Sequence, residues 1–164
     1  MRKDQVTEAL FVEHVEQQKD NMFRIAYGVL RDVVSAEDAV SEAVLKAWEK
    51  RSTLRDKEKM IQWLLKIVLN VSKTMALKRK REKLSGDMGL YADGAAPPPS
   101  LHIEQKIDIW QIVMALKEEY RLVVIMYYYS EFTVKEISSM LKIPEGTVKN
   151  RLFRARKILK IMLR

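Results

Sequence analysis

The stretch TVKEISSMLKIPEGTVKNRLFRARKILKIMLR, residues 133–164, decides how this chain is interpreted. Thr133 can cap a helix whose apolar residues recur at helical spacing, and Pro144 suits the first turn of a second helix. Nine Lys or Arg residues accompany only two carboxylates in this stretch. A basic helix-turn-helix of this kind predicts contact with duplex DNA.

The second helix of this motif carries the side chains that would contact base pairs. An apolar row at helical spacing predicts its buried side, comprising Val148, Leu152, Ala155 and Leu159. The predicted DNA-binding residues lie on the opposite side, and they are Thr147, Lys149, Asn150, Arg151 and Arg154. Arg pairs with guanine and Asn with adenine in the major groove. A basic helical hairpin without a DNA partner is the plainer alternative. Lys142, where many such turns carry Gly, predicts a strained or slightly different turn.

The charge of the chain is unevenly distributed. The formal net charge of the chain is +8. Residues 66–83 sum to +6 and residues 133–164 sum to +7, so these two segments account for the whole positive excess. Cationic clusters on folded domains favour a polyanion, because neutralised phosphates release counterions. We therefore expect nucleic acid as the partner first and an anionic membrane surface second.

The composition also excludes several classes of function. The chain has no cysteine, which excludes disulfides, thiolate catalysis and cysteine-based zinc sites. No Gly-rich phosphate loop or nucleophile–base pair is present, so we expect no enzyme activity, no cofactor and no small-molecule substrate. The N-terminus is too polar for a secretory signal, and no apolar run is long enough to cross a bilayer. A cytoplasmic location is expected.

Residues 85–100, SGDMGLYADGAAPPPS, separate two helical regions. They hold three of the five glycines and three of the four prolines, a composition that propagates neither helix nor strand. With 48% apolar residues, the chain can build two small cores. We predict an all-α fold of two small helical domains, at 1–84 and 103–164, joined by a flexible linker at 85–102.

Apolar spacing predicts the helices of the first domain. Two helices are expected on either side of a polar break at Gln17–Asn21. A third is expected over 36–51, behind a capping box formed by Ser35 and Asp38. A polar loop at 52–59 precedes a long fourth helix, from Met60 to Lys80. In the second domain, helices are expected from Ile103 to Leu116, around Tyr120–Tyr129, and in the helix-turn-helix.

The fourth helix presents a second possible nucleic-acid surface. Lys66, Asn70 and Lys73 follow its non-core face, and Leu77 and Arg81 continue the row. Such a face can follow a nucleic-acid backbone. A solvated helix end is the alternative, because charge runs usually have no partner.

The third helix carries an acidic face formed by Glu37, Asp38, Ser41, Glu42 and Glu49. Four carboxylates suggest a metal site, but the chain has only two histidines and metal sites usually need ligands from several elements. An exposed face or a protein contact is the better interpretation. The tryptophans, Trp48, Trp63 and Trp110, fall on or beside apolar stripes, so we expect them to be buried.

These pieces, in this order and over nearly the whole chain, resemble the extracytoplasmic function (ECF) sigma factors. These are compact bacterial initiation factors that give RNA polymerase its promoter specificity. The residues that resemble the family's regions 2.2 to 2.4 are Ala36-Glu37-Asp38, Glu42, Trp48, Trp63-Leu64, Ile67 and Asn70. Those that resemble region 4 are Leu116, Tyr120-Arg121, Glu136-Ile137, Pro144, Gly146-Thr147-Val148-Lys149, Arg151-Leu152 and Arg154-Ala155-Arg156.

The resemblance implies roles for the first domain. Its acidic helix would contact the clamp helices of the polymerase β′ subunit, through Asp38, Ser41 and Glu42. Loop 52–59 and the next helix would bind the melted minus-10 strand, through Lys66, Asn70 and Lys73.

The resemblance also implies roles for the rest of the chain. The second domain would bind the minus-35 duplex and the β flap, and the linker would run toward the polymerase active centre or the RNA exit path. An inhibitory anti-sigma factor, commonly linked to the membrane, would cover the polymerase-binding faces and could hold the protein there. The chain departs from the family pattern at Ser41, Thr74, Lys117 and Asn150, where Gln, Asp, Pro and Ser are usual.

Two other function classes remain open from the sequence. An autonomous helix-turn-helix regulator would use its N-terminal domain to sense a ligand or to dimerise, and a sensor needs an apolar pocket. The acidic face over 36–51 argues against such a pocket. A membrane-surface protein would use the basic amphipathic helix at 60–83.

Overall fold

The computed structural model describes residues 6–84 and 108–163 of the 164-residue chain. In these two ranges the regular secondary structure is entirely helical, so the expected all-α class is confirmed. The chain divides into two compact units, Met1–Asp93 and Gly94–Arg164, and two helical domains were predicted. The predicted linker at 85–102 lies outside the described residues, as do Ile103 and Ile107 of the first helix expected after it.

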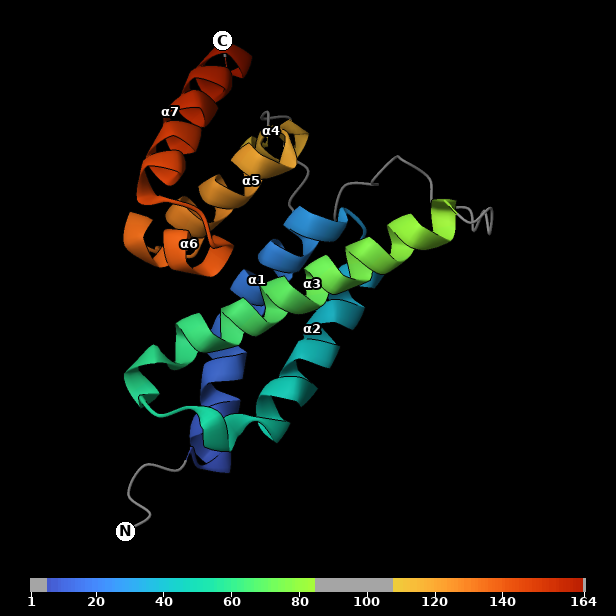
Figure 1. The fold of residues 1–164 in the computed structure, drawn as a ribbon, viewed down its shortest axis with the longest axis vertical. Coiled ribbons are helices and arrows are strands. Elements are labelled where there is room, and N and C mark those ends of the chain that lie inside the picture. Colours follow the sequence, from blue (N-terminus) through green and yellow to red (C-terminus); the bar gives the residue numbers. More distant parts are fainter. Residues whose placement is uncertain (1–5, 85–107, 164) are drawn as a thin grey trace. The chain divides into compact units, whose positions relative to one another are not determined.

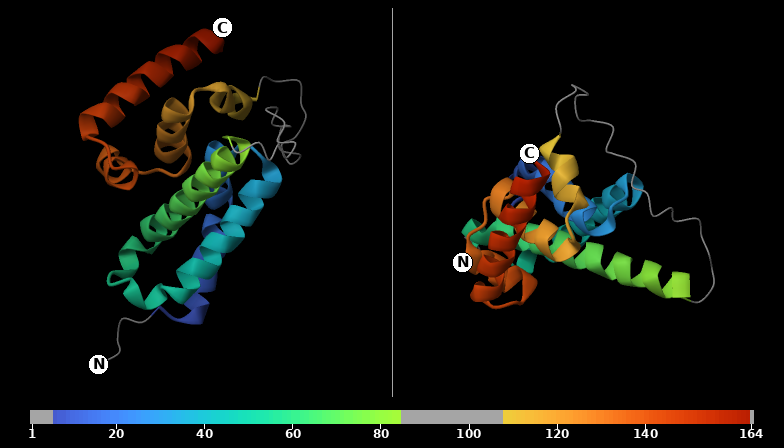
Figure 2. Two further views of the ribbon diagram at one scale, coloured as in Figure 1. Left: turned by 45° about the vertical axis from the view of Figure 1, so that its right-hand side comes forward. Right: turned by 90° about the horizontal axis from the view of Figure 1, so that it is seen from above.

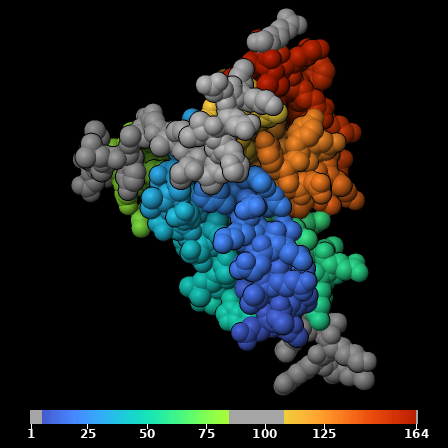
Figure 3. Space-filling view, turned by 180° about the vertical axis from the view of Figure 1, so that it is seen from behind, coloured from blue at the N-terminus to red at the C-terminus, as the bar shows by residue number. Residues whose placement is uncertain are grey.

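The first unit is a bundle of three helices, α1 (Glu8–Leu30), α2 (Val33–Glu49) and α3 (Met60–Leu84). Each of the three packs against the other two, as Figure 1 shows. In the space-filling view of Figure 3, α1 (blue) lies beside α2 (cyan) along one face of this unit. Two short 3₁₀ turns, η1 (Arg51–Thr53) and η2 (Lys57–Lys59), connect α2 to α3. The expected loop 52–59 and the expected start of the long helix at Met60 are confirmed.

The expected break in the first 30 residues was wrong, because α1 runs without interruption from Glu8 to Leu30. The polar segment Gln17–Asn21 contains no Gly or Pro, and its side chains are exposed or half-buried. Polar residues on a solvent-facing side do not end a helix, since each still makes its backbone hydrogen bond. Thr7 caps the helix through a hydrogen bond from the Leu10 N–H at 3.2 Å.

The expected capping box of α2 was also wrong. The cap is Asp32, whose carboxylate accepts hydrogen bonds from the N–H and the hydroxyl of Ser35, at 3.0 and 2.5 Å. Asp38 is exposed and lies one turn further along the helix. The capping signal was assigned one turn too late because both Asp and Ser suit an N-cap position. The helix therefore begins at Val33 rather than at residue 36.

The second unit contains α4 (Ile109–Ala115), α5 (Glu118–Val124), α6 (Val134–Leu141) and α7 (Glu145–Met162). A π-helical turn, η3 (Ile125–Tyr129), continues α5. The helix expected around Tyr120–Tyr129 is thus present, but its second half has a wider turn. α7 packs against α5 and α6, and both views of Figure 2 let the reader follow the four helices from gold to red.

The two cores are built mainly from aliphatic and aromatic side chains. Trp110 is 7% exposed, which confirms its predicted burial, whereas Trp48 and Trp63 are only half-buried. Both indoles therefore keep part of their surface accessible to solvent. The largest fully buried side chains include Tyr27, Leu69, Ile125 and Ile137.

Candidate DNA and polymerase interfaces

The turn between α6 and α7 has the geometry of a helix-turn-helix. The Thr133 hydroxyl accepts from the Glu136 N–H at 3.1 Å, and the Glu136 carboxylate accepts from the Thr133 N–H at 3.4 Å. This capping box begins α6. At its other end, Lys142 has φ 56° and ψ 46°, and its N–H bonds to the Ser138 carbonyl. The turn therefore keeps the left-handed conformation that Gly usually supplies, with a lysine in it.

The buried side of α7 is the predicted one. Val148, Leu152 and Ala155 are at most 2% exposed, and Leu159 is half-buried. At the start of the helix, a Cβ atom added to Gly146 would meet no heavy atom within 4 Å. The surface at Gly146 is therefore open, as a phosphate bound at a helix N-terminus requires.

The opposite side of α7 brings together most of the predicted DNA-binding residues. Lys149, Asn150 and Arg154 are exposed, and Thr147 is half-buried beside them. Arg151 lies on the flank that faces α5, where its Nη2 atom is 3.9 Å from the Glu119 carboxylate. The exposed side thus offers one amide and several cations within two turns, the groups that recognise base edges and phosphates.

One aromatic residue on this side, Phe153, was not predicted from the sequence. Phe153 is 54% exposed, and the Lys157 ammonium lies 4.6 Å from the centre of its ring. The residue falls outside the apolar row of α7, and this departure from the row was a usable signal. Exposed apolar side chains in the major groove contact thymine methyl groups. Phe153 therefore extends the candidate DNA surface.

The second candidate DNA surface follows α3. Asn70 is exposed, and Lys66 and Lys73 are half-buried on the same face. Leu77, 56% exposed, continues this row, and the half-buried Trp63 precedes it. An aromatic ring, an amide and cations on one helix face suit a strand whose bases are unstacked.

The third candidate surface is the exposed face of α2. Asp38, Ser41 and Glu42 are all exposed, and the Glu42 carboxylate pairs with the Lys46 ammonium at 3.3 Å. Because α-helical residues three or four apart share a face, Asp38 and Ser41 form one row. The predicted polymerase-binding residues are therefore accessible together.

Two exposed aliphatic residues on the same row of α2 were not predicted. Val34 is 65% exposed and Leu45 is 58% exposed, and they flank Asp38 and Ser41 at spacings of four residues. Apolar side chains within a polar helix face are typical of protein interfaces rather than of solvated helices. The α2 face thus combines a polar centre with apolar ends.

A cluster of four residues, Leu30, Asp32, Ser35 and Arg79, holds the end of α3 against the start of α2. The Arg79 guanidinium donates to the Leu30 carbonyl at 3.2 Å and to the Ser35 hydroxyl, and it lies 3.8 Å from the Asp32 carboxylate. The hydrogen bond from the Ser35 hydroxyl lowers the pKa of Asp32, and the nearby Arg79 charge lowers it further. This Arg79 cluster fixes the helix that carries Asn70 relative to the helix that carries Asp38.

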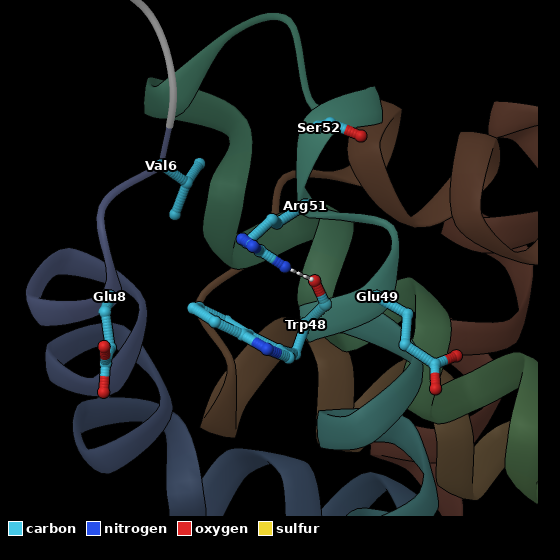
Figure 4. A pocket seen from close by; sticks show the side chains of 6 residues that line it. All are labelled: Val6, Glu8, Trp48, Glu49, Arg51 and Ser52. Atoms are coloured by element: carbon cyan, nitrogen blue, oxygen red, sulfur yellow. Dashed lines mark hydrogen bonds between the residues drawn. The ribbon is translucent and has the colours of Figure 1, made fainter.

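A cleft of about 360 Å³ lies at the other end of the bundle, where α2 ends. Figure 4 shows its lining: the Arg51 guanidinium lies 3.7 Å from the Trp48 ring centre and donates to the Trp48 carbonyl at 2.7 Å. Glu8, Glu49 and Ser52 complete a mainly polar lining, and Val6 lies on the same side of the cleft as Glu8. A sensor of an apolar ligand would need the opposite character, with hydrophobic walls and few polar groups.

Neither a metal site nor a membrane span is found in the ranges that the structure describes. Within 6–84 and 108–163, no group of three or more His, Cys, Asp or Glu side chains is arranged to hold a metal ion. Among the same residues, every helix is too short or too polar to cross a bilayer.

Comparison with known proteins agrees with the two-unit architecture. Residues 14–82 match the model of sigma-70 region 2, and residues 106–159 match that of sigma-70 region 4. The ECF RNA polymerase sigma factor SigW of Bacillus subtilis is 31% identical, over 94% of this chain and 89% of its own length. The RNA polymerase sigma factor SigV of the same organism is 26% identical, over 99% and 96%.

A solved structure shares the fold. It is the sigma factor RpoE of Bartonella quintana in complex with the anti-sigma factor NepR, with a TM-score of 0.79 and 24% identity over 93% of this chain and 96% of that chain. The sequence matches cover both units in the order that the sequence analysis expected. The chain belongs to the extracytoplasmic function sigma factors of the sigma-70 family.

Proposed function

We propose that this sigma factor directs core RNA polymerase to its promoters through three separate faces, one each on α2, α3 and α7. The observation that carries the proposal is the exposure of Lys149, Asn150 and Arg154 on α7, away from the buried Val148, Leu152 and Ala155. In this role the chain supplies contacts and performs no catalysis, and polymerase forms the RNA.

The α7 face binds the minus-35 element as duplex DNA. Arg154 and Asn150 recognise base edges in the major groove, and Thr147 and Lys149 contact the flanking phosphates. Arg151, at the α5 flank, makes a further phosphate contact from the edge of this face. Asn150 and Arg154, the two assigned base-reading residues, are both exposed, whereas Thr147 and Arg151 are half-buried.

The α3 face binds the minus-10 element after its strands separate. Asn70 supplies an amide that can hydrogen-bond to an unpaired base, and Lys66 and Lys73 flank it as phosphate contacts. Trp63 adds an accessible ring for stacking at the N-terminal end of this face.

The α2 face binds the clamp helices of the polymerase β′ subunit. Asp38, Ser41 and Glu42 supply polar contacts, while Val34 and Leu45 bury apolar area at either end. The second unit would in addition contact the β flap.

An anti-sigma factor is a further proposed partner. The structurally similar RpoE was solved with the anti-sigma factor NepR bound to it. An inhibitor that buries Val34 and Leu45 would exclude polymerase from the same α2 face. Because core polymerase and DNA are its partners, the protein would act in the bacterial cytoplasm. A membrane-linked inhibitor could hold it at the membrane until induction.

The two DNA contacts depend on their connection in one chain. When one domain is bound, the linker gives the other a high local concentration, so two weak contacts produce useful occupancy. We therefore expect weak promoter binding by the free chain and firm binding by the complex with core polymerase.

Run-off transcription with purified core polymerase tests the proposal. A mixed promoter library should yield transcripts only when the chain is present, and their start sites should share two upstream elements. The alternative, an autonomous regulator, predicts no promoter-dependent transcript and duplex binding by the free chain at about 10⁻⁸ M or below. The polar cleft at Trp48 argues against the ligand-sensing form of that alternative.

A further inference from the structure

The segment formed by α5 and η3 is attached to both flanks of α7. On one flank the Glu119 carboxylate pairs with Arg151 at 3.9 Å. On the other flank the Arg156 Nε–H donates to the Tyr128 hydroxyl at 2.6 Å. Two connections thus join the same two segments, and neither belongs to the apolar core.

Helix geometry shows that these two connections lie on different sides of α7. Arg151 and Arg156 are five residues apart, so their side chains leave the helix roughly 140° from each other. The buried residues Val148, Leu152 and Ala155 lie within that angle. The α5–η3 segment therefore reaches a polar partner beyond each edge of the apolar row, while α5 and α6 both pack against α7.

The connection through Tyr128 is the stronger of the two. It is a hydrogen bond of 2.6 Å from a charged donor, whereas the Glu119 pair is 3.9 Å long; both connections are accessible to solvent. The Arg156 guanidinium also lies 5.7 Å from the Tyr128 ring centre and 5.8 Å from that of Tyr127.

The π-helical turn brings this tyrosine to its position. The Ser130 N–H bonds to the Ile125 carbonyl at 3.0 Å, five residues back, so the turn contains one residue more than an α-helical turn. Such turns are rare and are frequently found at functional sites.

We propose that Tyr128 is a positioning residue that sets the rotation of the recognition helix α7 about its own axis. The apolar row alone permits small rotations, because aliphatic contacts have no direction. A rotation of about 20° would displace a side-chain end that lies about 6 Å from the axis by about 2 Å. That displacement is enough to break a bidentate contact with a base. The proposal rests on the proposed function, in which α7 binds the minus-35 duplex.

Three variants separate positioning from charge and from packing. Tyr128→Phe removes only the hydroxyl that accepts from Arg156. Tyr127→Phe is the matched control, because the described residues supply no hydrogen bond to its hydroxyl. Arg156→Lys keeps the positive charge but loses the Nε–H donor, so it separates a directed hydrogen bond from simple attraction to phosphate.

Transcription by the full chain with core polymerase gives the first readout. Activity is measured on promoters that carry each single substitution in the minus-35 element. Tyr128→Phe and Arg156→Lys should each reduce discrimination at one or more positions by about threefold or more, while Tyr127→Phe keeps the native pattern. The double variant should be no worse than the poorer single variant, because both changes remove the same bond. A uniform loss of activity with the native pattern retained would refute positioning and indicate a loss of stability or charge.

Nuclear magnetic resonance of the free chain gives a readout that needs no promoter. The Arg156 Nε–H signal should be ordered and protected in the native protein and in Tyr127→Phe, and it should become mobile in Tyr128→Phe. Equal mobility in all three would overturn the proposal. If native polymerase complexes ignored every minus-35 substitution, the proposed function would fail instead, and the Arg156 signal would still report on the bond itself.

Discussion

The Arg79 guanidinium, near the end of α3, lies 3.8 Å from the carboxylate of Asp32, the residue that caps α2. Arg79 also donates to the Leu30 carbonyl, 49 positions earlier in the chain. All three helices of the first unit therefore meet at one polar cluster. The buried core of this unit is mainly apolar, and this cluster gives the bundle a directional connection.

Arg79→Met should destabilise the first unit by about 1–2 kcal/mol, because it removes hydrogen bonds from a charged donor and keeps the aliphatic stem. Thermal unfolding of the full chain measures the change. Lys80→Met is the matched control, since Lys80 is the exposed neighbour and loses the same charge. Equal effects of the two substitutions would show that the Arg79 cluster adds no stability.

The lowered pKa of Asp32 predicts a contribution that depends on pH. A carboxyl whose pKa is lower in the folded state stabilises the protein above its unfolded pKa and loses this effect as pH falls through the folded value. The native protein should therefore lose more stability than Asp32→Asn between about pH 5 and about pH 3. Parallel stability curves for the two proteins over that range would contradict the assignment.

Lys142→Gly should stabilise the second unit by about 1 kcal/mol, because glycine adopts a φ of 56° without the strain that a Cβ atom causes. Lys135→Gly is the control, since Lys135 is the second residue of α6 and glycine at a helical position should destabilise the unit. Calorimetry of both variants measures the two effects. A lower melting temperature for Lys142→Gly would show that the lysine side chain makes a contribution larger than its strain.

Local signals in the sequence were sufficient for the helix-turn-helix of the second unit and insufficient for parts of the first unit. The Thr133 capping box and the apolar row of α7 were predictable because each depends on residues only a few positions apart. The continuity of α1 was not predictable from the sequence, because a polar segment can either end a helix or face solvent within one. Only the packing shows that Gln17–Asn21 belongs to a continuous helix.

The connections that orient the candidate sites join distant parts of the sequence. Arg79 meets Ser35 across 44 positions, and Arg156 meets Tyr128 across 28. Sequence periodicity does not predict such pairs. Any Arg of a basic run could be the one that makes the contact, and only the packing of the helices shows which one does. The exposure of Phe153, Val34 and Leu45 is different, because all three depart from the apolar rows of their helices and could have been recognised.

Arg154 and Arg151 should have different effects on recognition of the minus-35 element. Arg154→Ala removes an exposed side chain assigned to a base, so it should cost about 1–3 kcal/mol and relax specificity at one position. Arg151→Ala should weaken binding by a similar factor on every sequence, because that side chain is assigned to phosphate. Transcription from single-substitution promoters distinguishes the two, and identical patterns would refute the division of roles.

Asn70→Ala should slow open-complex formation and leave minus-35 recognition unchanged, because the amide is assigned to an unpaired base that becomes available only after melting. Permanganate footprinting of the polymerase complex measures melting directly, through the reactivity of unstacked thymines. Thr74→Ala is the control one turn along α3, since the Thr74 hydroxyl already donates to the Asn70 carbonyl at 2.9 Å. Normal footprints for Asn70→Ala, or an equal defect in Thr74→Ala, would remove the minus-10 assignment. Asn70 and Thr74 share an exposed face of α3, but the Thr74 hydroxyl is already hydrogen-bonded to the backbone. A defect confined to Asn70→Ala would therefore assign the contact to the Asn70 amide.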